Sequence, residues 1–347
     1  MEPSVNKKRR QPFDAYPAPL PEVMAYISSH STAVTSRGYR KTRWAINLLV
    51  SVFKRVSWRT AYRIGKIIGL LFYLLRIRRS VAMTNLDIVY GNTKSAAEKE
   101  AIYKASLINF GRLVVNYVRF PFVDISFWQN NCHMRNEALL QRAINQKKGV
   151  ILIAGHIGMM DLAGGKIGTS GYPVFLVGKS IKHPLFNELI HRTRNAVHLG
   201  TIRHKDSIRR ILKGLHRGEA IVMALDQNMK ERQGMFLNWM GRPASSVRAP
   251  ATVVKMTGAP VVAGYMYQKS ADQFELVVTE EVIWEPYPDD PEKEMVINAQ
   301  KQADAIQRII YEHPELWFWI HRRWKRQPAG IPSPYKRKSR RKKKKKR

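Results

Sequence analysis

The chain contains a single cysteine, Cys132, among its 347 residues, so it cannot form an intrachain disulfide. This fits a reducing compartment, and we interpret Cys132 as a small buried apolar residue. No apolar run reaches the roughly 20 residues that a bilayer-spanning helix needs, and residues 1–43 lack the apolar core of a secretory signal. We therefore expect the main fold to stay in the cytoplasm.

Acidic residues are also scarce, because 26 Asp and Glu stand against 60 Lys and Arg, for a net charge of +34. The last twelve residues, Lys336–Arg347, carry eleven of these positive charges, and the rest of the chain is strongly basic as well. Such a field favours anionic partners: phospholipid headgroups, phosphorylated glycolipids, an acidic carrier protein or nucleic acid. Composition does not choose among them.

Proline content and charge divide the chain into segments. Residues 1–40 contain five prolines among Ser, Thr and basic residues, a composition typical of a flexible leader. Residues 41–80 carry two apolar stretches, AINLLVSVF and IGKIIGLLFYLL, flanked by aromatic and basic residues, which favours helices lying in a membrane surface. A core helix and a tilted, partly inserted anchor are the alternatives. Residues 81–335 form the main domain, and 336–347 a disordered polybasic tail.

From Thr93 onward, helical and strand-like patterns alternate, which indicates an α/β fold whose sheet is covered by helices on both faces. Ser95 and Glu98 have the spacing of a capping box and predict the start of a helix. Asp290 predicts the N-cap of the last long helix. We predict strands at Val150–Ala154, Tyr172–Val177, Ala220–Leu225, Pro260–Tyr267 and Phe274–Ile283, and helices near Asn136–Asn145, Leu185–Arg194, Ser207–Leu215 and Pro291–His313.

The stretch Val150–Leu162, VILIAGHIGMMDL, combines a buried-type strand with polar residues at its carboxyl end. His156 and Asp161 both follow this strand, at the sheet edge where acid–base chemistry is commonly built. The alternative is a hydrogen-bonded core histidine. A second pair with the same spacing, His183 and Glu188, has no strand before it, and we interpret it as a chance match.

Two further clusters are expected near the same edge. Asp226 and Gln227 end the run AIVMAL, where Asp226 either orders the site, contacts an acceptor or caps the next turn. In PELWFWIHRRWKRQP, His321, Arg322 and Arg323 are interleaved with tryptophans, a mixture suited to a phosphate-rich membrane interface. A solvated basic turn packed on its tryptophans and a nucleic-acid surface are the alternatives.

These motifs together resemble the late acyltransferases of lipid A biosynthesis. The resemblance rests on Gly155-His156-x-Gly-x-x-Asp161, Asp226-Gln227, the loop GMFLNWMGRPASS and the closing PELWFWIHRRWKRQPAGIPSPY. It implies an acyltransferase domain over 81–335 with the glycerolipid-acyltransferase type of α/β fold. It also implies an enzyme on the cytoplasmic face of a bacterial inner membrane that moves a fatty acyl chain from acyl carrier protein to a hydroxyl of a phosphorylated glucosamine lipid.

Carried onto this sequence, the resemblance makes His156 the general base and Asp161 the acid that orients it, although members usually have Glu at that position. Lys179 stands where many members have arginine. The lysine keeps the positive charge but lacks the bidentate fork of arginine. No cofactor, metal or nucleic-acid partner is expected. The predicted substrate-binding residues are Gly158, Lys179, Asp226, Gln227, Arg242, Arg322 and Arg323.

The chemistry accounts for these residue types. A neutral imidazole at His156 can accept the proton of a hydroxyl as it attacks a thioester, and a carboxylate on the far ring nitrogen fixes the tautomer. The oxyanion would be held by backbone N–H groups around Gly158 or by Lys179.

Two other functions stay open: an acyltransferase using acyl-CoA and another glycolipid or aminolipid, and a basic membrane-binding or nucleic-acid-binding protein without enzymatic activity.

Overall fold

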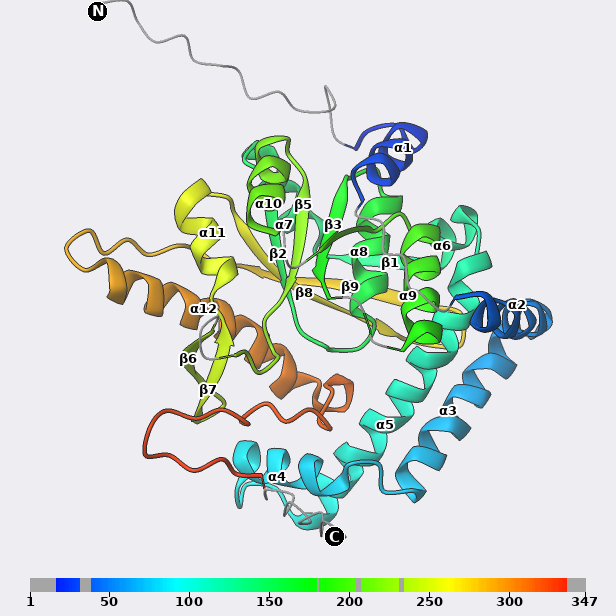
Figure 1. Cartoon of the computed structure of the whole chain (residues 1–347), viewed down its shortest axis with the longest axis horizontal. Coiled ribbons are helices and arrows are strands. Elements are labelled where there is room, and N and C mark those ends of the chain that lie inside the picture. The colour runs from blue at the N-terminus through cyan, green and yellow to red at the C-terminus, as the bar shows by residue number, and fades with distance from the viewer. Residues whose placement is uncertain are drawn as a thin grey trace, which may run out of the picture.

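The computed structural model describes residues 17–31, 39–179, 181, 183–203, 207–230 and 234–335. Its centre is a seven-stranded sheet with the order β1-β9-β8-β2-β5-β3-β4 (Figure 1). All neighbours are parallel except β8 and β9, so the strands from β8 to β4 all end at one edge. The strands are β1 Cys132–Arg135, β2 Val150–Ala154, β3 Val174–Gly178, β4 Gly200–Arg203, β5 Ala220–Ala224, β8 Val261–Gln268 and β9 Phe274–Glu281.

Helices cover both faces of this sheet, which explains why its central strands are apolar throughout. Every residue of β2 is buried, as parallel strands between two helical layers require. One face carries α6 Ile125–Asn131, α7 Glu137–Asn145, α8 Met160–Thr169 and α9 Pro184–Ala196. The other carries α10 Ser207–His216, α11 Ala249–Thr257 and α12 Pro291–Glu312. The predicted α/β class is confirmed.

The predicted elements agree closely with these bounds. All five predicted strands and all four predicted helices are present, each beginning and ending within two residues of its prediction. The capping box is confirmed, because Ser95 Oγ accepts from the Glu98 amide and Glu98 Oε2 accepts from the Ser95 amide. Asp290 caps α12 through the amide of Lys293. The short strands β1 and β4 and the antiparallel hairpin of β6 Gly234–Trp239 and β7 Arg242–Val247 were not predicted.

Part of the predicted flexible leader is folded. Residues Leu20–His30 form helix α1, which has Pro19 as its N-cap and Pro21 in its first turn, where a proline costs no helical hydrogen bond. Val23 and Ile27 are buried, and the hydroxyl of Tyr26 donates to the buried carboxylate of Glu219 at 2.6 Å. The leader prediction is therefore wrong for this stretch. Residues 1–16 and 32–38 lie outside the described part of the chain.

Residues 41–80 are largely helical, in α2 Tyr39–Arg55 and α3 Trp58–Leu74. Helix α3 packs against α5, Ala96–Arg119, at a crossing so close that a Cβ at Gly69 would lie 2.4 Å from the Cα of Ile108. Helices α2 and α3 lie beside the sheet on the side of α5 and α9 (Figure 1). Among the described residues, no helix combines the length and the apolarity needed to cross a membrane.

The segment after α12 crosses beneath the β6–β7 hairpin toward α4, Arg79–Tyr90 (Figure 1). Asn85 of α4 is fully buried and donates to the carbonyls of Trp319 and His321 at 2.6 and 2.7 Å. Trp317, Trp319 and Trp324 are buried, so they serve as core residues and are not available to membrane headgroups. The polybasic tail, 336–347, lies outside the described residues.

Candidate active site

The carboxyl ends of three adjacent strands, β2, β5 and β3, carry the predicted site residues other than the three arginines. His156 follows β2, Asp226 and Gln227 follow β5, and Lys179 follows β3. Because these strands are parallel neighbours, residues far apart in sequence meet at one edge of the sheet, facing α5 and the segment after α12.

The imidazole of His156 is held by Asp226. Asp226 Oδ1 lies 2.8 Å from His156 Nδ1, and Asp226 Oδ2 accepts from the His156 backbone amide at 2.8 Å. An ionised carboxylate only accepts hydrogen bonds, so Nδ1 carries the hydrogen and the lone pair of the neutral ring is on Nε2. The side chain of His156 is one-third exposed and lines a cavity.

Asp226 is buried and receives a third hydrogen bond, from Trp317 Nε1 at 2.9 Å. Burial would raise the pKa of the Asp226 carboxyl, but the charge and hydrogen bonds of His156 lower it well below its usual range, with help from Trp317. Burial would likewise lower the pKa of His156, and the charge and hydrogen bond of Asp226 reverse this and raise it. The two groups stabilise each other as an ion pair once the ring gains a proton.

Asp161 has a different position from the one predicted. Its Oδ1 accepts from Nε and Nη2 of Arg194 at 3.1 and 2.8 Å, and its Oδ2 accepts from the hydroxyl of Tyr117. The carboxylate that hydrogen-bonds the His156 ring is thus Asp226, and the orienting contact expected of Asp161 is not formed. Asp161 still raises the pKa of His156 through its charge. Arg194 and Tyr117 were not predicted.

Gly158 has the left-handed conformation, with φ of 56°, and a Cβ there would lie 2.1 Å from the carbonyl oxygen of Met266. Only glycine fits this position. Its amide donates to the carbonyl of Leu316 at 2.9 Å, and the next amide, of Met159, donates to that of Met266 at 2.8 Å. These two N–H groups are therefore occupied, and neither is free for an oxyanion.

His156 lines a cavity of about 510 Å³. Its lining is mainly apolar and comes from α5, the strand ends and the turn after α12. Three predicted residues, Gly158, Lys179 and Gln227, line it together with His156 and Asp161. Gln227 Nε2 lies 2.8 Å from His156 Nε2. Apolar lining residues include Phe110, Leu113, Met160, Ile190, Met223 and Phe318.

The three predicted arginines do not line this cavity. Arg323 is fully buried, stacks on Trp239 and donates to Ser245 and Ser246 of the hairpin, and its burial lowers the pKa of the guanidinium to about 9. The assignment of Arg323 to substrate is therefore wrong. Arg242 donates to the side chain of Gln327 and the carbonyl of Pro332, which fastens the hairpin to the C-terminal segment. Arg322 is half-buried and lies over the ring of Tyr335.

The loop after β5 is held in place by a hydrogen bond to His321. Nε2 of His321 accepts from the amide of Asn228 at 3.2 Å, and the side chain of Asn228 accepts from the amide of Arg326. Burial lowers the pKa of His321 to about 4, so its ring is neutral and can accept this bond at neutral pH. Residues of the basic, tryptophan-rich motif thus hold the loop that carries Asp226 and Gln227.

The other histidine match is unrelated to the site. His183 is exposed at the start of α9, where its ring lies 5.2 Å from that of Phe186. Glu188 pairs with Arg192 at 2.7 Å. Within the described ranges, no group of three or more His, Cys, Asp or Glu side chains is placed to hold a metal ion.

Known sequences similar to this chain identify its family. Residues 29–326 match the profile of the family described as bacterial lipid A biosynthesis acyltransferase. The chain belongs to this family. As a member of the lipid A biosynthesis acyltransferases it is an O-acyltransferase, which confirms the resemblance seen in the sequence.

Relatives within the family are distant in sequence. The lipid A biosynthesis palmitoleoyltransferase of Escherichia coli K12 is 25% identical over 266 residues, which cover 75% of this chain and 83% of the relative. A lipid A biosynthesis acyltransferase of Shigella flexneri matches to the same extent. The lipid A biosynthesis lauroyltransferase of Escherichia coli K12 is 23% identical over 321 residues, covering 90% of this chain and all of the relative.

Proposed function

We propose that this acyltransferase moves a fatty acyl chain from acyl carrier protein to a hydroxyl of a lipid A precursor, at the cytoplasmic face of the bacterial inner membrane. The observation that carries the proposal is the His156–Asp226 pair, in which Asp226 holds Nδ1 and leaves the lone pair on Nε2, in a histidine that lines an apolar cavity. Its family membership supports the reaction class, and the names of its relatives support the acceptor class.

His156 is the general base of the proposed reaction. Its Nε2 takes the proton of the acceptor hydroxyl as the oxygen attacks the thioester carbonyl, and the imidazolium returns that proton to the departing thiolate. Asp226 holds the ring in the tautomer with Nε2 free and stabilises the imidazolium. Asp161 is a positioning residue in this scheme, because it fixes Arg194 and Tyr117 in the wall of the cavity.

The cavity is suited to the acyl chain. Its volume of about 510 Å³ lies in the range of roughly 300–1,000 Å³ of pockets that enclose small ligands. Removing a long alkyl chain from water is favourable by about 0.8 kcal/mol per CH₂. We propose that the chain lies against Phe110 and Leu113 of α5, with the thioester near His156.

Three basic residues line the cavity or are next in sequence to residues that line it, and they support an acidic donor. Lys179 lines it directly, Lys230 follows the lining residue Met229, and Arg248 stands between the lining residues Val247 and Ala249. All three side chains are exposed and have no ion-pair partner within the described residues. We call them the basic rim, and propose that it attracts acyl carrier protein. Arg322, outside this rim, is proposed to contact the acceptor phosphate.

Helices α2 and α3 are proposed to bind the membrane surface. Exposed apolar side chains repeat at helical spacing on each helix, Trp44, Leu48 and Val52 on α2 and Ile67, Leu71 and Leu74 on α3. Exposed apolar faces of this kind beside basic residues are typical of helices lying in a bilayer surface. The polybasic tail is proposed to add attraction to anionic lipid.

The proposal is tested by purified protein, an acyl-carrier-protein thioester and an under-acylated lipid A precursor. We expect release of free carrier thiol together with a lipid product heavier by one acyl group, measured by mass spectrometry. If product forms only with acyl-CoA, the proposed donor is wrong. If product forms only with a different glycolipid, the proposed acceptor is wrong. Absence of thioester consumption with every donor would contradict the proposed function.

A further inference from the structure

The side chain of Gln227 occupies the one position where the acceptor hydroxyl must bind. Its Nε2 lies 2.8 Å from Nε2 of His156, and Nδ1 of the same ring is committed to Asp226. In the neutral ring Nε2 has a lone pair and no hydrogen, so the amide of Gln227 donates to it. The base is therefore capped by a donor, and a hydroxyl can reach it only after Gln227 moves.

Gln227 is free to make this move. Its residue is exposed, while the backbone on either side of it is fixed, by Asp226 bonded to His156 and by Asn228 bonded to His321 and Arg326. A glutamine side chain rotates about three bonds, so its amide can shift without any change in the loop. The anchored backbone keeps the displaced amide next to the reacting atoms.

The reaction needs a hydrogen-bond donor at that place. When the acceptor oxygen attacks the thioester carbon, negative charge develops on the carbonyl oxygen of that carbon. This oxygen and the attacking oxygen, which gives its proton to His156, are then bonded to the same carbon atom. The amides two and three positions after the histidine are already used, because Gly158 donates to Leu316 and Met159 donates to Met266. Neither can stabilise this charge without breaking a bond that shapes the loop.

We infer that Gln227 is a catalytic residue, which caps His156 in the resting enzyme and donates to the oxyanion of the tetrahedral intermediate during acyl transfer. The acceptor hydroxyl displaces the amide and gives its proton to His156 Nε2 as its oxygen bonds to the thioester carbon. The C=O electron pair moves onto oxygen, where the Nε2–H of Gln227 binds it. Collapse re-forms the carbonyl and expels the thiolate, which takes the proton from His156 and leaves as thiol.

This inference rests on the proposed function, and its test is designed to separate the two. Gln227→Leu keeps the approximate shape and removes the donor, whereas Gln227→His keeps a donor. We expect Gln227→Leu to lower kcat by about 10²–10³ with KM changed less than threefold, since loss of one oxyanion donor typically has this effect. The kcat of Gln227→His should exceed that of Gln227→Leu by at least about tenfold. Gln146→Leu, the same change at an exposed position on α7's end, should equal the wild type.

A second readout distinguishes an oxyanion donor from a structural residue. A phosphonate analogue of the acyl donor carries the tetrahedral charge, and the corresponding amide analogue does not. Gln227→Leu should weaken inhibition by the phosphonate by a factor similar to its loss in kcat/KM, and leave inhibition by the amide unchanged. Equal weakening of both analogues would overturn the inference, as would a Gln227→Leu enzyme with wild-type or increased kcat. If the wild-type enzyme consumes no thioester, the proposed function itself fails.

Discussion

The Nδ1 atom of His156 lies 2.8 Å from Oδ1 of Asp226, a residue 70 positions later in the chain. The carboxylate five positions after the histidine, Asp161, pairs instead with Arg194 of α9. The two acidic residues therefore have separate tasks: Asp226 acts on the ring, and Asp161 on the wall of the cavity. Substitutions at these positions should have different consequences.

Asp226→Asn should lower kcat by about 10⁴ while the protein stays folded, because an amide can favour the wrong ring tautomer and cannot stabilise the imidazolium. Asp161→Asn should instead lower the free energy of unfolding by roughly 3 kcal/mol, since it leaves the charge of Arg194 buried without its partner. Its kcat, per folded molecule, should exceed that of Asp226→Asn by at least about tenfold. Denaturant unfolding and thioester turnover measure the two effects.

A double variant provides the control for this prediction. Arg194→Gln combined with Asp161→Asn removes both charges, and it should be more stable than Asp161→Asn alone because no unpaired charge remains. The account would be contradicted if Asp161→Asn lost as much kcat as Asp226→Asn without any loss of stability.

The pH dependence of kcat/KM follows from the raised pKa of His156. Only the neutral ring can accept a proton, so activity should fall as the pH drops below a pKa that lies above the ordinary value of about 6.5. The charged groups acting on the ring are Asp226, Asp161 and Arg194. Asp226→Asn removes the largest of the raising effects, so the residual activity of this variant should persist to lower pH. An acid limb that does not move in Asp226→Asn would assign the titration to another group.

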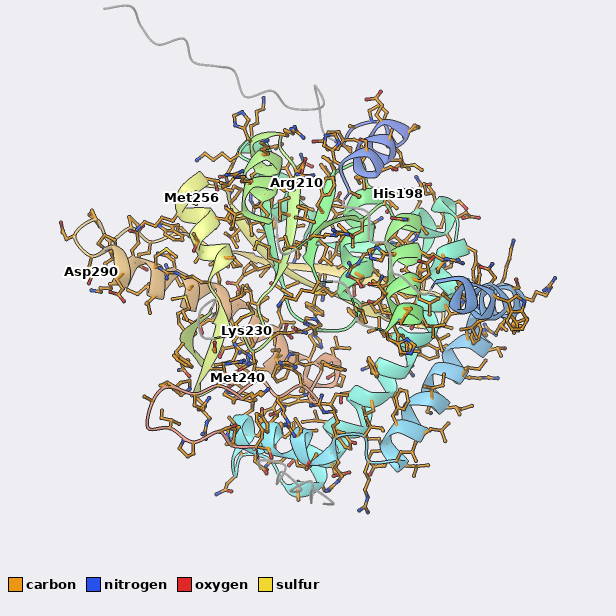
Figure 2. The ribbon with its side chains drawn as sticks, in the orientation of Figure 1. His198, Arg210, Lys230, Met240, Met256 and Asp290 are labelled. Carbon is orange, nitrogen blue, oxygen red and sulfur yellow. The ribbon has the colours of Figure 1, made fainter. Side chains whose placement is uncertain are left out.

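The basic rim gives a prediction about the donor. Replacing Lys179, Lys230 and Arg248 together by Ala should raise KM for an acyl-carrier-protein donor by about tenfold or more at low salt, and this difference should shrink as salt is added. Turnover of a short acyl-pantetheine donor should change much less. Figure 2 shows Lys230 beside the β6–β7 hairpin and Arg210 of α10 at the opposite end of the sheet.

The control for the rim uses two basic residues of α10, the helix that contains Arg210. Arg209 and Lys213 of α10 are exposed and do not line the cavity, so their joint replacement by Ala removes charge outside the basic rim. It should leave KM for the carrier-bound donor within about twofold of wild type. Equal effects of the two sets would mean that net charge, and not a docking surface, attracts the donor.

The exposed faces of α2 and α3 give a prediction about membrane binding. Replacing Trp44, Leu48, Leu71 and Leu74 by Gln should lower binding to vesicles of phosphatidylglycerol and phosphatidylethanolamine by at least about tenfold, because each apolar side chain contributes on the order of 1 kcal/mol when buried. Turnover on detergent-dispersed substrate should persist. Met256→Gln with Ile283→Gln, at equally exposed positions outside these helices, should bind like wild type.

The sequence was sufficient for the fold class and for the place of the site. Buried strands leave a strong apolar signal, and β2 was predicted to the residue, so the amino-acid pattern alone assigns His156 and Asp226 to strand ends. The short edge strands β1 and β4, of four residues each, carry too little periodicity to be recognised. Helix α1 was missed because the prolines around its start resemble a leader, although Pro19 is the N-cap and Pro21 lies in the first turn, which tolerates proline.

The partner of the histidine could not be deduced from spacing. Which carboxylate reaches Nδ1 depends on the packing of α8 against α5 and α9, where Arg194 and Tyr117 take Asp161. A single arginine or tyrosine in an amphipathic helix gives no signal of this role. Arg323 was misassigned for a related reason, because its burial depends on the β6–β7 hairpin, which was itself unpredicted.

The most direct test of the account compares the two histidines that share the same spacing to an acidic residue. His156→Ala and His183→Ala, each verified as folded by circular dichroism, are assayed for acyl transfer from the carrier-protein thioester to the lipid acceptor. We expect His156→Ala to lose at least about 10²–10³ in kcat and His183→Ala to be close to wild type. An active His156→Ala enzyme, or equal loss in both variants, would contradict the account.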